Sequence, residues 1–158
     1  MEGRSTKMID GVVAKALHRI MDARGGLMEI FRNDSLMFEN FGQCYISETF
    51  PGIVKAWHCH EHQTDFICCV SGIVEVGLWD GREDSSTYDE TSSMVIGDPC
   101  PMLIRIPEGV WHGWKCLHDK MSVVLNIPTR TYNHTSPDEL RRPWNDQRID
   151  YDWDVRGG

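Results

Sequence analysis

Short apolar runs recur along most of the chain, and glycine and proline residues separate them. The runs are rich in valine, isoleucine and aromatic residues, which fit the pleated surface of a β-strand. Pro51-Gly52 and Asp80-Gly81 are among the turn signals between the runs. Many short strands at close spacing are typical of a β-sandwich or barrel. The pattern predicts an antiparallel all-β fold with strands at 12–17, 26–31, 44–47, 53–58, 65–70, 73–79, 94–96, 102–106, 110–112 and 121–126.

Helical signals are confined to two short segments. Asn33 is suited to cap a turn over residues 34–39, and Ser136 followed by Pro137 is a typical helix start for residues 136–142. We therefore expect only minor short helices, covering less than about a fifth of the residues against the usual third.

The chain length is that of one domain, because 158 residues lie within the range of about 100–200 residues per domain. We expect a single domain over residues 1–158. Its first residues, about 1–8, are polar and are expected to be flexible. Residues from about 136 to 158 are expected to form an arm that packs on the barrel through aromatic residues such as Trp144.

Charge and hydropathy restrict the partners and the location. The net charge of −8 and the pI near 5.3 argue against nucleic acid as a partner. The sequence has no long apolar run of membrane-spanning length and no apolar segment of a secretory signal near its start. Its six cysteines lack the spacing of a disulfide framework. These features predict a cytoplasmic protein with free thiols and no membrane partner.

Two segments have the spacing of the two cupin motifs. In the first, His58 and His60 precede Asp65, which stands where the motif usually has glutamate. In the second, residues 107–112, Pro-Glu-Gly-Val-Trp leads to His112. Residues two apart on a strand share a face, so both histidines of the first segment can face a barrel interior. The two motifs predict a cupin-type double-sheet jelly roll with a histidine cluster inside it.

Two interpretations of this cluster remain open. His58, His60, His112 and Asp65 offer imidazole and carboxylate donors that suit one divalent metal such as Fe, Zn, Mn or Ni. The same side chains can instead line a polar pocket and bind a ligand without metal. His62 falls in a turn and is expected to be solvated.

Five segments resemble the dTDP-4-dehydrorhamnose 3,5-epimerase family. They are similar, in order, to the family patterns D-x-R-G-x-x-x-E, Q-x-N-x-S with G-V-x-R-G-x-H, D-x-R-x-x-S-x-T, I-P-x-G-x-x-H-G, and W-x-D with I-x-W. The resemblance runs in register over nearly the whole chain, and its segments are residues 22–29, 43–58, 80–87, 106–113 and 144–153. It implies a homodimeric double-sheet jelly roll that acts on a small-molecule nucleotide sugar without a cofactor.

The resemblance also implies roles for individual residues. His58 matches the histidine base that removes a proton beside the keto group of a nucleotide-linked deoxysugar. Lys55 replaces a family arginine and can place a positive charge near a phosphate or an enolate oxygen. Arg24 and Glu29 match positions that grip the nucleotide, across the dimer. The substrate-binding set implied by the alignment is Arg24, Glu29, Gln43, Lys55, Arg82, His112 and Asn126.

Three departures from the family change the expected site. Asn126 stands at the position of the catalytic tyrosine, Asp65 replaces a lysine, and His60 replaces a glutamine. His60 and Asp65 could replace the missing groups, because an imidazolium beside a carboxylate can donate a proton or stabilise an enolate. The catalytic set expected from the sequence is therefore His58, His60 and Asp65.

Three functions are compatible with these residues. The first is a keto-sugar epimerase or isomerase. The second is a metal-dependent cupin enzyme, an oxygenase or a lyase, that uses the four metal-ligating candidates. The third is a sugar-binding cupin without catalytic activity.

Overall fold

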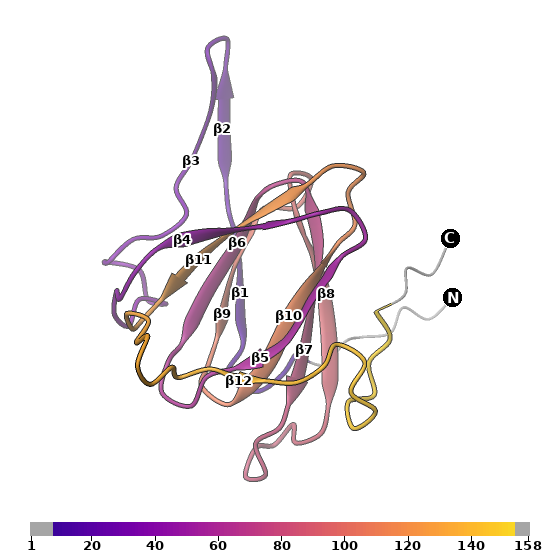
Figure 1. Ribbon diagram of the computed structural model, residues 1–158. Coiled ribbons are helices and arrows are strands. Elements are labelled where there is room, and N and C mark those ends of the chain that lie inside the picture. The colour runs from indigo at the N-terminus through magenta and orange to yellow at the C-terminus, as the bar shows by residue number, and fades with distance from the viewer. Residues whose placement is uncertain (1–7, 154–158) are drawn as a thin grey trace.

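Two antiparallel five-stranded sheets face each other in the computed structural model, which describes residues 8–153 (Figure 1). The strand order is β1-β9-β6-β11-β4 in the first sheet and β12-β5-β10-β7-β8 in the second. This architecture confirms the predicted all-β double-sheet jelly roll. The strands are β1 (Val13–Ala16), β2 (Arg19–Asp22), β3 (Gly25–Met28), β4 (Tyr45–Thr49), β5 (Val54–Cys59), β6 (Asp65–Ser71), β7 (Ile73–Asp80), β8 (Thr91–Gly97), β9 (Met102–Ile106), β10 (Val110–Cys116), β11 (Ser122–Pro128) and β12 (Leu140–Arg141).

The inner faces of the two sheets form the main core. Ile67 of β6 and Val124 of β11 meet Val76 and Leu78 of β7 there, and all four are buried. Apolar burial of this kind stabilises the fold by roughly 25 cal/mol per Å² of area removed from water. The core fills one end of the space between the sheets, while polar side chains lie toward the other end.

Strand alternation explains where those polar side chains point. Side chains two residues apart share a face, so Asp65 lies on the inner face of β6 with Ile67. Asn126 likewise lies on the inner face of β11 with Val124, and both Asp65 and Asn126 are buried. A buried polar cluster inside a barrel is the arrangement expected of a ligand site.

The outer face of the second sheet is covered by the C-terminal segment. Ile149 and Trp153 pack there against Trp57, Trp79 and Trp111, and all five are buried. Trp144, which was expected to pack on the barrel, instead leaves 53% of its surface exposed. This contact fixes β5, because Trp57 turns outward into the cluster while its neighbour His58 turns inward. Residues 1–7 and 154–158 lie outside the described part of the chain, so the expected flexible N-terminus and the last residues of the arm fall there.

The β2–β3 hairpin stands out from the barrel (top of Figure 1). Its side chains Ile20, Met21 and Leu27 each leave more than half of their surface exposed. The sequence analysis missed β2, because this strand lacks a clear alternation of apolar and polar residues.

The prediction of a helix at residues 136–142 is wrong. This segment contains β12, in which Arg141 pairs with His58 of β5. The Asp138 carboxylate accepts hydrogen bonds from the backbone N–H groups of residues 61 and 62, 2.9 Å each. The capping signal at its start is thus overridden, because the polar groups of the segment bond to the edge of the second sheet.

The other expected helical segment, residues 34–39, consists of turns, and the structure has no helix within residues 8–153. It therefore has no helix that is long and apolar enough to cross a membrane in that range. The apolar strand predicted at 12–17 pairs with β9 of its own chain. This pairing involves no second subunit. All six cysteines are free, as expected.

Candidate active site

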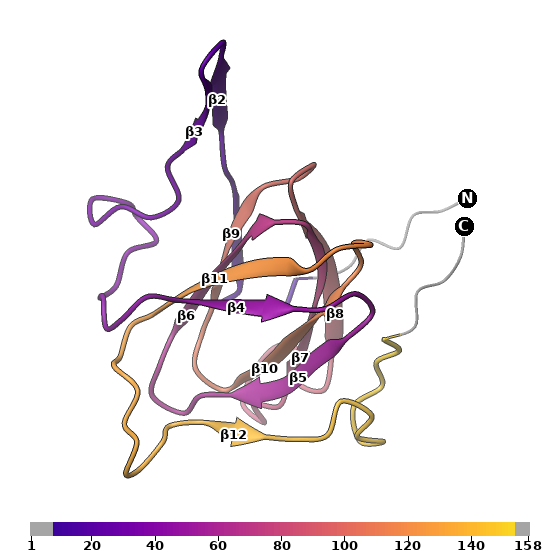
Figure 2. The same ribbon diagram turned by 45° about the horizontal axis from the view of Figure 1, so that its top comes forward.

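A cavity of about 480 Å³ lies between β4 of the first sheet and β5 and β12 of the second. Figure 2 shows these three strands, which border the same side of the barrel. Strand β4 contributes Tyr45 and Ser47, which are two residues apart and share a face. The lining residues are Tyr45, Ser47, Lys55, Ala56, Trp57, His58, Trp114, Glu139, Arg141 and Arg142.

A β-bulge brings Lys55 and His58 to this cavity together. An odd spacing on a regular strand would place them on opposite faces. The pairing register changes between them, because His112 of β10 pairs with His58 while Trp114 pairs with Lys55. Strand β5 therefore carries one extra residue. Gly113 lies at the bulge, where a Cβ would stand only 2.5 Å from the Lys55 carbonyl oxygen, so glycine permits the close approach of β10.

His58 forms the boundary between the cavity and the barrel interior. Its ring centroid lies 4.1 Å from that of His112 and 5.9 Å from that of Trp114. Burial lowers the pKa of His58 well below its usual value, and the neighbouring His112 lowers it further. His58 is therefore a neutral imidazole at neutral pH, which is the form that can accept a proton.

Behind His58, two imidazoles converge on one carboxylate oxygen. The Nε2 atoms of His60 and His112 each lie 3.2 Å from Asp65 Oδ2. On the far side of each ring, Nδ1 hydrogen-bonds a backbone carbonyl oxygen, that of Asp138 for His60 and that of Val110 for His112. Because a carbonyl oxygen only accepts, each Nδ1 carries a proton, and each Nε2 is aimed at the carboxylate.

The charges of this cluster follow from burial and hydrogen bonding. Burial alone would raise the pKa of Asp65, but the hydrogen bonds from His112 and His60 hold it below its usual range. Burial alone would lower the pKa of His60, but the hydrogen bond and the charge of Asp65 raise it. His60 and Asp65 thus form an imidazolium–carboxylate pair.

The same side chains are a possible set of metal ligands. One ligand atom each from His58, His60 and Asp65 lies within 4.8 Å of the others. Imidazole nitrogens whose other nitrogen bonds a carbonyl are typical metal ligands, and such a set suits a divalent transition metal. Both imidazoles also approach the Asp65 carboxylate, so ion pairing accounts for the geometry as well.

Charged side chains surround the cavity mouth. Lys55 Nζ donates to Ser47 Oγ at 2.9 Å and to the Glu48 carbonyl oxygen at 2.6 Å. Arg141 Nη2 lies 2.8 Å from Glu139 Oε2. The Arg142 guanidinium points elsewhere: its Cζ lies 4.7 Å from the Trp111 ring centroid in the outer tryptophan cluster, and its Nη1 pairs with Asp146 at 3.2 Å. Two cations at one cavity, Lys55 and Arg141, favour an anionic ligand.

Of the ten lining residues, only Lys55 and His58 were predicted; the missed residues with ionisable side chains are Tyr45, Glu139, Arg141 and Arg142. The last three lie in or beside β12, where a helix was expected instead of a strand on the cavity edge. Tyr45 could have been found from the pattern, because it precedes Ser47 by two residues on a predicted strand.

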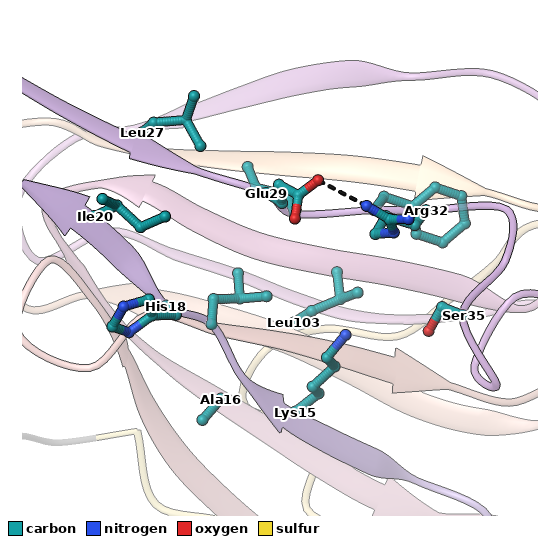
Figure 3. Close-up of a pocket in the computed structure, with 12 residues that line it drawn as sticks. Lys15, Ala16, His18, Ile20, Leu27, Glu29, Arg32, Ser35 and Leu103 are labelled. Atoms are coloured by element: carbon teal, nitrogen blue, oxygen red, sulfur yellow. Dashed lines mark hydrogen bonds and ion pairs between the residues drawn. The ribbon is translucent and has the colours of Figure 1, made fainter.

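Two nucleotide-binding candidates, Arg24 and Glu29, lie outside the His58 cavity of their own chain. Arg24 is at the tip of the β2–β3 hairpin, with its side chain 90 % exposed and paired with Asp22. Glu29 follows β3 and lines a separate cavity of about 220 Å³ at the base of the hairpin. Figure 3 shows that cavity and the ion pair between Glu29 and Arg32, 2.9 Å long.

Arg82 is engaged elsewhere. Its guanidinium bonds the buried Asp80 carboxylate, with Nε 2.8 Å from Oδ1, and the Asp10 carbonyl oxygen. Ser85 and Thr87 hydroxyls donate to the same carboxylate. Arg82 therefore organises the loop between β7 and β8 and does not line the His58 cavity.

The remaining candidates lie close to the cavity without lining it. Gln43 Oε1 accepts the backbone N–H of Tyr132 at 3.2 Å. Asn126 is buried on β11, and its Nδ2 donates to the Val124 carbonyl oxygen at 3.0 Å. The structure thus brings together His58, His60, Asp65 and His112, with Lys55 beside His58 and Asn126 on the facing sheet.

Comparisons with known proteins identify the family. The family model for dTDP-4-dehydrorhamnose 3,5-epimerase matches residues 6–157. The spore coat polysaccharide biosynthesis protein SpsL of Bacillus subtilis is 42% identical over 148 residues, which cover 94% of this chain and 98% of SpsL. The probable low-salt glycan biosynthesis epimerase Agl13 of Haloferax volcanii is 43% identical over 149 residues, 93% of this chain and 96% of Agl13.

A solved structure agrees with these relatives. The crystal structure of a dTDP sugar isomerase from Desulfovibrio desulfuricans superimposes with a TM-score of 0.87 at 30% identity, covering 92% of each chain. The matches favour an epimerase over a metal-dependent cupin enzyme. The chain therefore belongs to the dTDP-4-dehydrorhamnose 3,5-epimerase family, and its function is that of a sugar epimerase, an isomerase.

Proposed function

We propose that this enzyme removes a proton next to the keto group of a nucleotide-linked deoxysugar, with His58 as the base and without a metal or organic cofactor. The observation that carries the proposal is a neutral imidazole in the wall of a cavity that cations surround. Proton abstraction beside a carbonyl needs a base in its unprotonated form and a positive group near the oxygen that becomes an enolate.

Lys55 is suited to stabilise the enolate oxygen. The β-bulge places it on the same cavity as His58, and its ammonium group is already held by Ser47 and the backbone of Glu48. Such a preorganised cation needs little rearrangement as negative charge develops. Arg141 lies farther along the lining and suits the diphosphate of the nucleotide.

The His60–Asp65–His112 cluster is assigned a positioning role. It lies behind His58 and is absent from the cavity lining. Its ion pairing holds His112 against the His58 ring, and burial together with His112 lowers the pKa of His58, while the Asp65 charge acts in the opposite direction. The sequence predicted that His60 and Asp65 act as catalytic groups. On the basis of this geometry, we propose instead that they act through His58.

We also propose that the enzyme is a homodimer in the cytoplasm. The exposed apolar side chains Ile20, Met21 and Leu27 cover a hairpin that extends away from its own barrel. A second copy would bury them, and it would bring Arg24 of one subunit toward the other subunit. Light scattering of the purified protein is expected to give the mass of two chains, and Leu27→Glu is expected to shift it toward one.

The test of the reaction is solvent exchange. The enzyme is incubated in D₂O with a dTDP-linked 4-keto-6-deoxysugar, and deuterium at the carbons beside the keto group is followed by NMR. The wild type is expected to introduce deuterium. His58→Asn is expected to lose exchange by about 100-fold or more, while dTDP affinity stays nearly unchanged because the base acts in the transition state. Exchange retained in His58→Asn would exclude His58 as the base.

A further inference from the structure

Inversion of a carbon centre requires two proton sites. A base removes the proton from one face of the sugar ring, and inversion follows only if a proton reaches the carbon from the other face. A site with His58 alone would return the proton to the same face and regenerate the substrate. The proposed function therefore needs a proton donor across the cavity from His58, and the inference below rests on that function.

The cavity lining offers few candidates for this donor. Lys55 Nζ is held by two hydrogen bonds, and Glu139 pairs with Arg141. Arginine guanidinium groups keep their protons at neutral pH. The hydroxyl of Tyr45 is different, because within residues 8–153 it has no hydrogen-bond partner. Tyr45 also lies on β4, on the opposite wall from β5 and its His58.

The sheet register links Tyr45 to the position where the family tyrosine is missing. Asn126 of β11 pairs directly with Tyr45 of β4. Directly paired residues on antiparallel strands project from the same face with Cβ atoms about 4.5–5.5 Å apart. Tyr45 stands at the asparagine of the pattern Q-x-N-x-S, and Asn126 stands at the family tyrosine. Relative to the family pattern, tyrosine and asparagine have thus exchanged positions between the paired strands β4 and β11.

We infer that Tyr45 is the catalytic proton donor of this enzyme, in place of a tyrosine at position 126. His58 takes the proton from carbon and becomes an imidazolium, while the bonding electrons form the enolate. The Tyr45 O–H then gives its proton to the opposite face of that carbon and becomes a phenolate. Exchange with water restores the neutral imidazole and the neutral phenol.

The environment of Tyr45 keeps it in the acid form. Burial raises its pKa to about 12, and the charges of Asp65 and Glu139 act in the same direction. The phenol is thus fully protonated at neutral pH. Because the residue as a whole is 46% exposed, the hydroxyl can also exchange with solvent between turnovers.

Tyr45→Phe separates this role from the role of His58. The variant loses only a hydroxyl group, and it is expected to form the epimerised product about 100-fold or more slowly than the wild type. His58 still removes and returns the proton from one face. Deuterium should therefore continue to enter the recovered, unepimerised sugar in D₂O. A merely structural contribution of the hydroxyl would lower exchange and epimerisation together.

Tyr88→Phe is the matched control, because Tyr88 is 51% exposed on the loop after β7 and does not line the cavity. It is expected to epimerise at the wild-type rate. The assignment of Tyr45 would be overturned if Tyr45→Phe epimerised at the wild-type rate, or if it lost exchange and epimerisation equally. Either result would leave the proposed function standing. Failure of the wild type to introduce deuterium would overturn the proposed function, and the Tyr45 assignment with it.

Discussion

His58 and His112 are direct partners across β5 and β10, with ring centroids 4.1 Å apart. Burial of His58 disfavours its charged form, and the neighbouring imidazole adds to this effect, so the pKa of His58 lies well below 6.5. A base with a lowered pKa stays unprotonated at lower pH. We expect the acid limb of kcat/KM to lie clearly below pH 6.5 in a pH–rate profile. An acid limb at or above pH 6.5 would contradict this.

Asp65→Asn is expected to destabilise the fold by about 3 kcal/mol or more, because it leaves the buried His60 imidazolium without its counter-charge. Chemical denaturation measures the change in the free energy of unfolding. Asp34→Asn is the control, since Asp34 forms an exposed ion pair with Arg32 and such pairs contribute little. Equal stability of Asp65→Asn and the wild type would show that the cluster is not an ion pair.

The same substitution changes the response to acid. The pKa of Asp65 is lower in the folded protein than in the unfolded chain. Its contribution to stability is present above the unfolded value of about 3.9 and is lost as the pH falls through the folded value. We expect unfolding midpoints of Asp65→Asn to decline less steeply than those of the wild type below about pH 4.

Removal of divalent metal distinguishes the two interpretations of the histidine cluster. If His58 acts as a base, dialysis against a chelator is expected to leave epimerisation unchanged, and elemental analysis is expected to find less than one equivalent of Fe, Zn, Mn or Ni. If His58, His60 and Asp65 hold a catalytic metal, the dialysed enzyme loses activity and regains it with one added metal. That result would restore the metal-dependent function.

Arg82→Ala tests whether this arginine acts on substrate or on the fold. It leaves the buried Asp80 carboxylate with only hydroxyl and backbone donors, so we expect a loss of about 3 kcal/mol in unfolding free energy. KM is expected to stay within about twofold. Arg148→Ala, which removes a cation from the surface, is the control. A large rise in KM with unchanged stability would support the substrate-binding role suggested by the family pattern.

The strands could be predicted because each sheet buries a face and therefore shows short apolar runs. The histidine set could be predicted from motif spacing, since His58, His60 and His112 lie on strands whose alternation is regular up to the bulge. The bulge itself could not, because its cause is the approach of Gly113 on another strand. Regular strand alternation, with a period of two residues, would have placed the Lys55 side chain on the face opposite to that of His58.

The C-terminal side of the site escaped prediction for a different reason. Residues 136–142 have a typical helix start, and local propensity favours a helix there. Asp138 instead bonds the backbone after β5, which is a contact between residues more than seventy positions apart. Strand alternation places Tyr45 on the face of Ser47, but its relation to position 126 depends on the pairing of β4 with β11, which sequence spacing does not reveal.

The position of β12 has a consequence for solubility. Strand β5 would otherwise be the edge of the second sheet, with free N–H and C=O groups that invite pairing with another molecule. Two residues, Leu140 and Arg141, cover part of that edge, and Arg141 also supplies the cavity with a guanidinium group. Strand β12 thus protects the barrel from edge-to-edge aggregation and also places positive charge at the entrance to the site. Substitutions in β12 would therefore affect both solubility and the charge of the site.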